Sequence, residues 1–366
     1  MREIRQQIEA MAAAFATPEA PIPRDLVKTA LQLILGSVDL ARSFSFDSET
    51  GNAWGELNNK LQAYCLFEHV DSILGIAYDK RLSLTEMIVR ASALDPYFSV
   101  WATEGVGHYF TDLHLQKQIL PENLLTEAGQ GLASARMVPL HSGMALSLAE
   151  FSLGRLNSGG NCAHAVNCFI EACQHNCKAG YFGIGYEGLG FVTRILHPRL
   201  LGPIDSHLSR FWPEVLTYFW HGVGRAIYFS PLNFMPCEGS SLAGLEMAMR
   251  DAPHLLAKRN VIAGFAWAST LINIRHPKII ATLLQNCREM PELDAFVNGV
   301  QSALVAWCGS TPEHDFLDTF CQYRPQTSDQ YFLQFWDSHV VKPGEEVLKE
   351  YRSMEAAKRV GDLFHC

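Results

Sequence analysis

The clearest candidates for acid–base chemistry in this sequence are Glu104, His108 and Asp112, which follow one another at intervals of four residues. Residues four apart lie on one face of an α-helix, so the three side chains would form one polar stripe two turns long. Such a stripe can transfer a proton or hold a divalent metal ion, and the imidazole titrates near neutral pH. The alternative is a solvated face with a helical salt bridge. We favour proton transfer, with no metal ion and no cofactor.

A second set of ionisable residues comprises Glu187, His221 and Arg225. His221 and Arg225 are again four residues apart, and Glu104, Glu187 and His221 each stand directly before a glycine. If these glycines mark equivalent repeats that curl around one axis, the side chains converge on one largely apolar cavity. There Arg225 could hold an anionic group by forked hydrogen bonds, or it could pair with Glu187 or Glu104 in a buried network between repeats. The candidate catalytic residues are Glu104, His108, Asp112, Glu187, His221 and Arg225.

The segment from Cys162 to Cys177 superficially resembles a metal site. On a helix its residues separate into an apolar face and a polar face, the latter with His164, Cys168, Glu171 and His175. One helix rarely supplies more than two zinc ligands, and paired C-x₂₋₄-C ligands are absent. The segment therefore indicates buried cysteines beside an exposed polar face, and zinc binding is the less favoured alternative.

The segment Gly183 to Gly188 matches the G-x-G-x-x-G pattern of dinucleotide sites. That fingerprint requires a preceding strand, whereas the Cys/His helix precedes it here. We expect a helix-ending loop instead. Walker A, G-x-S-x-G, H-E-x-x-H, Glu-x-x-His and aspartate-rich cyclase motifs are all absent from the sequence.

The elements that position these residues are indicated by a recurring phrase, in which glycine is followed by an apolar residue, a small residue and a mostly apolar run. The phrases begin at Gly105, Gly143, Gly188, Gly222, Gly264 and Gly299, at intervals of 38, 45, 34, 42 and 35 residues. This period is typical of two helices and their connections. Glycine inside a helix costs roughly 1 kcal/mol relative to alanine, so its recurrence indicates close helix–helix packing.

Proline residues close most of the phrases, because proline ends one helix and suits the first turn of the next. They stand at Pro121, Pro198, Pro231, Pro277 and Pro312. The segments Pro198 to Phe219 and Pro277 to Met290 are expected to be partner helices. The predicted fold is all-α: a helical-repeat solenoid or toroid of αα-hairpins, with the glycine-rich helices inside.

A single domain over residues 1–366 is expected, since no linker rich in Pro, Gly or Ser divides the chain. Residues 1–95 would form an N-terminal helical cap, with helices at Asp25 to Ala41 and Leu66 to Tyr78 and a polar loop at Phe44 to Glu56. Residues 96–325 hold the repeats. Residues 326–366 would form a solvent-facing C-terminal helix.

Composition excludes several classes of function. The 366 residues are 48% hydrophobic and 18% charged with a formal net charge of −9, which disfavours nucleic acid as a partner. The longest uncharged apolar stretch, Val261 to Ile274, is shorter than the ~20 residues of a transmembrane helix. The N-terminus lacks a secretory signal and the ten cysteines are irregularly spaced, so we expect a cytoplasmic protein without a disulfide framework.

The phrases EGVG at Glu104, YEGLGF at Tyr186, HGVGRAIYF at His221 and GFAWAS at Gly264 resemble an uncharacterised bacterial protein family. Its members are encoded beside enediyne polyketide synthases and in other natural-product gene clusters. The likeness covers roughly residues 60–325, with Tyr228 where the family pattern has tryptophan. The resemblance implies a role in natural-product biosynthesis on a lipophilic, polyene-like or isoprenoid intermediate. It supplies no catalytic residues.

These observations predict a protein that encloses such an intermediate and promotes cyclisation or isomerisation by acid–base catalysis. The expected partners are a lipophilic small-molecule substrate and a biosynthetic synthase. The alternative is a non-catalytic helical-repeat binding protein or scaffold for that synthase.

Overall fold

The structure is a computed structural model that describes residues 48–77, 82–116, 119–127, 131–158, 161–230, 233 and 240–366. The described residues are almost wholly helical and contain no strand, which confirms the predicted all-α class. The predicted helix at Asp25 to Ala41 and the predicted stop at Pro231 lie outside the described residues. No described helix is both long enough and apolar enough to cross a membrane.

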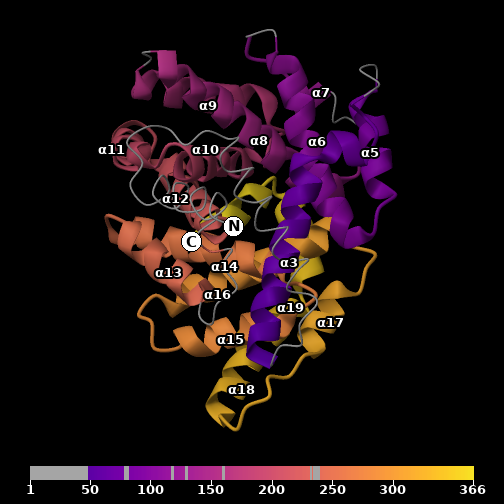
Figure 1. The fold of residues 1–366 in the computed structure, drawn as a ribbon, viewed down its shortest axis with the longest axis vertical. Helices are drawn as coiled ribbons and strands as arrows, with labels where there is room; N and C mark the ends of the chain where they lie inside the picture. Colours follow the sequence, from indigo (N-terminus) through magenta and orange to yellow (C-terminus); the bar gives the residue numbers. More distant parts are fainter. Residues whose placement is uncertain are drawn as a thin grey trace, which may run out of the picture.

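Six core helices carry the six glycine phrases, one phrase each. They are α6 (Pro96–Leu115), α8 (Met137–Gly154), α10 (Phe182–Leu196), α12 (Pro213–Tyr228), α14 (Leu255–Ile272) and α16 (Leu293–Ser310). Each packs against the next along the chain, and Figure 1 shows this order as a colour change from purple at α6 to orange at α14 and α16. The last core helix, α16, also contacts α8.

Further helices pack against the core helices. They are α9 (Cys162–Asn176), α11 (Leu201–Phe211), α13 (Ser240–Asp251), α15 (Pro277–Cys287) and α17 (Phe316–Gln322). Proline begins several helices as predicted, including α15 at Pro277. The predicted partner helix Pro198 to Phe219 is wrong in its second half, because Pro213 begins α12 and the partner helix ends at Phe211.

The glycines lie where neighbouring core helices approach most closely, as the phrase predicted. Added Cβ atoms at Gly143, Gly222, Gly264 and Gly299 would overlap the carbonyl oxygens of Glu104, Glu187, His221 and Ala263 respectively. Each of these carbonyls belongs to the residue directly before the glycine of the preceding phrase. Gly188 departs from this register, since its Cβ would lie 2.8 Å from the Cβ of Ala145. Four of the five successive helix pairs therefore cross in one register.

The N-terminal helices are α3 (Ser48–Glu68), α4 (Val70–Ile73) and α5 (Leu84–Ser92), followed after α6 by α7 (Leu124–Glu127). Helix α3 packs against α6 and also contacts α14. The polar loop predicted for Phe44 to Glu56 is wrong over Ser48 to Glu56, which begins α3, and the first four residues of that loop lie outside the described ones; packing of α3 against α6 and α14 overrides the loop-like composition. The helix predicted from Leu66 is broken, because α3 ends at Glu68 and Gly75 has a φ of +63°.

The C-terminal region is several short helices rather than the one solvent-facing helix predicted. They are α18 (Gln330–Trp336), the π-helix η5 (Asp337–Val341), α19 (Lys342–Gly344), α20 (Val347–Ala356) and the 3₁₀-helix η6 (Val360–Phe364). Phe364, near the end of the chain, is buried: its ring contacts His221 and Trp267, and the Cys366 N–H donates to Asn260. Hydrophobic burial of Phe364 accounts for this difference.

Candidate functional site

Arg225 is the centre of a buried hydrogen-bond network that joins four core helices. Its Nη1 donates to Glu187 Oε2 at 3.0 Å and to Ser142 Oγ at 2.7 Å, and its Nη2 donates to Glu104 Oε1. Ser142 Oγ in turn donates to Glu104 Oε1 at 2.8 Å. The Nδ1 of His221 lies 2.9 Å from Glu187 Oε1. The network confirms that Arg225 pairs with both carboxylates between phrases.

Burial makes the charges in this network strongly interdependent. The side chains of Arg225 and Glu187 are only 4% and 1% exposed. Burial alone would raise the pKa of Glu187, but the charge of Arg225 and the hydrogen bond to His221 outweigh it and hold that pKa below its ordinary value. Burial likewise opposes the charge of Arg225, but its two carboxylates raise the pKa of the guanidinium overall. The ionised Glu187 is an acceptor, so His221 Nδ1 is the donor between them.

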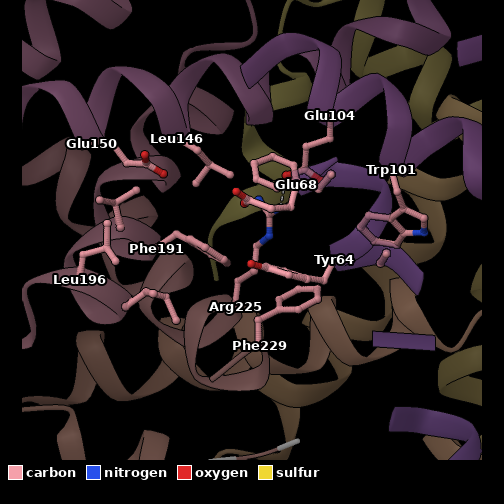
Figure 2. A pocket seen from close by; sticks show the side chains of 14 residues that line it. Tyr64, Glu68, Trp101, Glu104, Leu146, Glu150, Phe191, Leu196, Arg225 and Phe229 are labelled. Atoms are coloured by element: carbon pink, nitrogen blue, oxygen red, sulfur yellow. Dashed lines mark hydrogen bonds and ion pairs between the residues drawn. The ribbon is translucent and has the colours of Figure 1, made fainter. Parts of the chain in front are cut away.

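A cavity of about 110 Å³, partly open to solvent, lies beside this network. Its charged lining residues are Glu68, Glu104, Glu150 and Arg225, and Figure 2 shows Arg225 reaching toward Glu104 with Glu150 and Trp101 on opposite sides. Aromatic and aliphatic side chains form most of the rest. The lining residues are Ala63, Tyr64, Phe67, Glu68, Trp101, Glu104, Leu146, Glu150, Phe191, Val192, Ile195, Leu196, Arg225 and Phe229. An apolar pocket with a few convergent polar groups is typical of a small-molecule site.

Equivalent positions of the glycine phrases build much of this cavity. Three positions contribute: the residue directly before the phrase glycine and the residues three and seven after it. Together they supply Glu104, Leu146, Glu150, Phe191, Ile195, Arg225 and Phe229. The shared register of the core helices therefore brings equivalent side chains to one place.

The two carboxylate oxygens of Glu104 differ in their hydrogen bonds. Oε1 accepts both hydrogen bonds, from Ser142 and from Arg225. Within the described part of the chain, Oε2 accepts none. Because Glu104 lines the cavity, Oε2 can accept a proton or a hydrogen bond from a molecule bound there.

His108 and Asp112 belong to a separate cluster that includes Glu150. His108 Nδ1 lies 3.4 Å from Asp112 Oδ2, and His108 Nε2 lies 3.4 Å from Glu150 Oε1. Ser147 Oγ donates to Asp112 Oδ1 at 2.5 Å. The imidazole is buried and packs edge-on against Phe67 at 5.1 Å, whereas the Asp112 side chain is 47% exposed. The cluster thus runs from solvent to the cavity.

The predicted convergence of the candidate residues is confirmed in part. Glu104, Glu187, His221 and Arg225 form one network, although only Glu104 and Arg225 line the cavity. His108 and Asp112 do not join that network and do not line the cavity. The residues of the predicted polar stripe therefore belong to two clusters. Glu104 pairs with Arg225 of α12, whereas His108 pairs with Asp112.

The Cys/His segment forms α9 with the two faces that the sequence predicts. Phe169, Cys173 and Cys177 are buried, while His164 and His175 are exposed. Among the described residues, no group of three or more His, Cys, Asp or Glu side chains could hold a metal ion.

The G-x-G-x-x-G segment is neither a phosphate loop nor the helix-ending loop predicted. Gly183 to Gly188 lie in the first turns of α10, which begins at Phe182. An added Cβ at Gly185 would approach Cys177 Sγ to 2.8 Å, so helix packing accounts for this glycine.

Sequence reasoning missed Ser142 and Glu150. Ser142 stands directly before Gly143, at the position that Glu104, Glu187 and His221 hold in their phrases. Glu150 stands seven residues after Gly143, as Asp112 stands after Gly105. A comparison of equivalent positions in all six glycine phrases would have identified both residues.

A second buried network, also missed, holds Lys60 between α3, α12 and α14. Lys60 Nζ lies 3.3 Å from Glu56 Oε1 and 3.9 Å above the Tyr228 ring, and it donates to the carbonyl of Asn233. Tyr228 OH donates to Glu56 at 2.7 Å and accepts from Asn273 at 2.9 Å. None of these five residues lines the cavity.

Comparison of the chain with protein-family models, with curated proteins and with solved structures gave no match.

Proposed function

We propose that the protein encloses a lipophilic, polyene-like or isoprenoid biosynthetic intermediate in this cavity and promotes its cyclisation or isomerisation by acid–base catalysis. The observation that carries the proposal is the uncommitted Oε2 of Glu104 at a mostly apolar cavity. In this role Glu104 removes a proton from the bound intermediate. A positioned general base of this kind contributes typically about 10²–10⁴-fold to a rate.

The surroundings of Glu104 support the role of a base. Arg225 and Ser142 fix the position of the carboxylate through Oε1, and Oε2 accepts no hydrogen bond from the described residues. The guanidinium also packs against the rings of Phe191 and Trp267, with its Cζ 5.1 and 5.6 Å from their centroids. Such packing keeps Arg225 oriented and water away from the ion pair. Positioning of this kind lowers a barrier without further reorganisation.

The proposal extends to the architecture and the biological context. We propose that the core helices and their outer partners are αα-hairpin repeats curled into a solenoid or toroid. The shared glycine register supports this, as do the contact of α16 with α8 and the 5.6 Å approach of the Trp307 and Tyr97 rings. The resemblance to the family encoded beside polyketide synthases motivates a place in natural-product biosynthesis.

The experiment is a conversion assay with a matched pair of variants. Purified protein is incubated with extract of a producing strain that lacks it, and metabolites are compared by mass spectrometry. We expect a product of unchanged mass from the wild type and a loss of about 10²-fold or more in Glu104→Gln. Glu171→Gln, which changes an exposed carboxylate on α9, should convert at the wild-type rate. Wild-type turnover by a folded Glu104→Gln protein would contradict the proposal.

A non-catalytic binding protein or synthase scaffold is the second candidate. The mutual pairing of Glu104, Glu187 and Arg225 favours it, because a buried network of this kind also holds helices together without chemistry. This candidate predicts that the wild type retains a lipophilic metabolite from the extract and returns it unchanged. Glu104→Gln would then alter retention only.

A further inference from the structure

The cluster of Asp112, His108 and Glu150 connects solvent to the cavity through one imidazole. Its two ring nitrogens face different carboxylates, Nδ1 toward Asp112 and Nε2 toward Glu150, each at 3.4 Å. The side chains of Asp112, His108 and Glu150 are 47%, 6% and 24% exposed, and Glu150 lines the cavity. The most exposed carboxylate thus lies at one end and the cavity carboxylate at the other.

We propose that Glu150 is a second catalytic residue, the proton donor that complements Glu104, and that His108 and Asp112 are positioning residues that resupply its proton from solvent. The inference rests on the proposed function and deepens it. Glu104 and Glu150 project into one cavity from adjacent helices, α6 and α8. Their separate partners, Arg225 for Glu104 and His108 for Glu150, suit them to different tasks.

The two carboxyl groups define a class of reaction. Glu104 Oε2 takes a proton from one carbon of the intermediate, and the electron pair of that C–H bond shifts along the conjugated or cyclising chain. Protonated Glu150 gives its proton to a second carbon, where the shifted electron pair forms the new C–H bond. The intermediate keeps its composition, and no oxidant or reductant is needed. The substrate class is therefore an unsaturated lipophilic molecule that undergoes allylic double-bond migration, or ring closure with loss and gain of one proton.

The imidazole returns the enzyme to its starting state. After the transfer Glu150 is ionised, and neutral His108 gives it the Nε2 proton while Nδ1 accepts one from solvent through Asp112; exchange with solvent then returns the ring to its Nε2–H form. Glu104 releases its proton to solvent through the open side of the cavity. A neutral imidazole accepts at one nitrogen while it donates at the other, which this step requires.

Other ionisable groups face Glu150 and bear on its pH dependence. His197, which follows α10, interacts electrostatically with Glu150, and burial lowers the pKa of His197. His108 faces it from α6, and Glu68, Glu104 and Arg225 line the same cavity. His108 is the histidine whose ring nitrogen lies 3.4 Å from Glu150 Oε1, so geometry assigns the proton transfer to His108.

The test is the conversion assay in D₂O with a defined set of variants, each checked for folding by circular dichroism. The wild type should place one solvent deuterium in the product. Glu150→Gln should lower turnover by about 10²-fold or more, and Glu150→Asp should restore part of it. His108→Ala should lower turnover by about tenfold or more and recover with added imidazole, whereas imidazole should not rescue Glu104→Gln. If His108→Ala does not fold, Asp112→Asn replaces it and should make turnover depend on buffer concentration.

The outcomes separate this inference from the proposed function. Conversion by the wild type but also by Glu150→Gln, within about threefold, would overturn the role of Glu150 and leave that of Glu104 intact. A folded His108→Ala protein that is slow and not rescued by imidazole would overturn the relay. No conversion by the wild type would overturn the proposed function, and this inference with it.

Discussion

Arg225 and Lys60 are both cations buried inside the helical core, and each is paired with glutamate, but they differ in what lies beyond the pair. Arg225 joins Glu104 and Glu187 next to a cavity, and Glu104 keeps one oxygen uncommitted. Lys60 joins Glu56 and the carbonyl of Asn233 above the Tyr228 ring, and none of these residues lines the cavity. The first arrangement can act on a bound molecule, whereas the second fastens α3 to α12.

The comparison shows that a buried charge is not by itself a sign of chemistry. Both clusters answer the same physical demand, since an ion taken out of water must be paired and hydrogen-bonded. The Arg225 cluster differs from the Lys60 cluster in two respects. Two of its residues line a cavity, and Glu104 Oε2 accepts no hydrogen bond within the network. The most direct test of this difference removes the cation at the centre of the candidate site.

Removal of Arg225 should have the largest effect on stability. Arg225→Met leaves two buried carboxylates without their cation, so we expect a loss of about 3–5 kcal/mol in the free energy of unfolding, measured with urea. The triple variant with Glu104→Gln and Glu187→Gln should recover part of this loss, because it removes the unpaired charges. A cost below about 1 kcal/mol for Arg225→Met alone would mean that the network is not formed in solution.

Overpacking of a glycine contact should have the next largest effect. Gly188→Leu drives a side chain into Ala145 of α8 and should lower the free energy of unfolding by about 1–3 kcal/mol. Gly202→Ala is the matched control, because nothing lies within 4 Å of a Cβ there, and its effect should stay within about 1 kcal/mol. Equal effects at both positions would contradict the packing role, and nucleotide binding lost in Gly188→Leu would restore the dinucleotide interpretation.

Burial of Lys60 should make the free energy of unfolding depend on pH above neutrality. Burial lowers the pKa of Lys60 from its ordinary 10.5, so the unfolded chain binds more protons than the folded chain between the lowered value and 10.5. Stability therefore rises with pH in that window, by at most about 1.4 kcal/mol per pH unit from this group. Urea unfolding from pH 7 to 9.5 should show a smaller rise in Lys60→Met than in the wild type. Identical slopes would contradict the burial of this amine.

Much of the fold was predictable because the glycine phrase records a physical constraint. Helices that cross at a backbone carbonyl exclude a Cβ, so glycine must recur wherever such crossings recur, as at Gly222 and Gly264. The same constraint aligned Glu104, Glu187 and His221, which is why their meeting with Arg225 could be expected. The helical state of the polar first residues of α3 could not be predicted from the glycine phrase, because it depends on packing of α3 against α6 and α14.

The rest of the site depends on contacts between segments far apart in the chain. No spacing rule relates Lys60 to Asn233, or Phe364 to His221, since each pair meets only after the core helices have packed. Helical periodicity correctly placed Asp112 one turn from His108, but it could not show that Ser147 and Glu150 of α8, rather than Arg225, join these two residues. Local sequence patterns therefore predicted which polar residues belong to the site, but not which residues they contact.

Titration with a fluorescent polyene, all-trans-retinol, shows whether a lipophilic molecule binds beside Glu104. The account predicts saturable binding of one retinol per chain and a loss of about tenfold or more in affinity for Ile195→Trp, which fills the cavity from its wall. Val89→Trp, at an exposed position on α5, should bind as the wild type does. Equal affinity of Ile195→Trp and wild type, with both proteins folded, would contradict the claim.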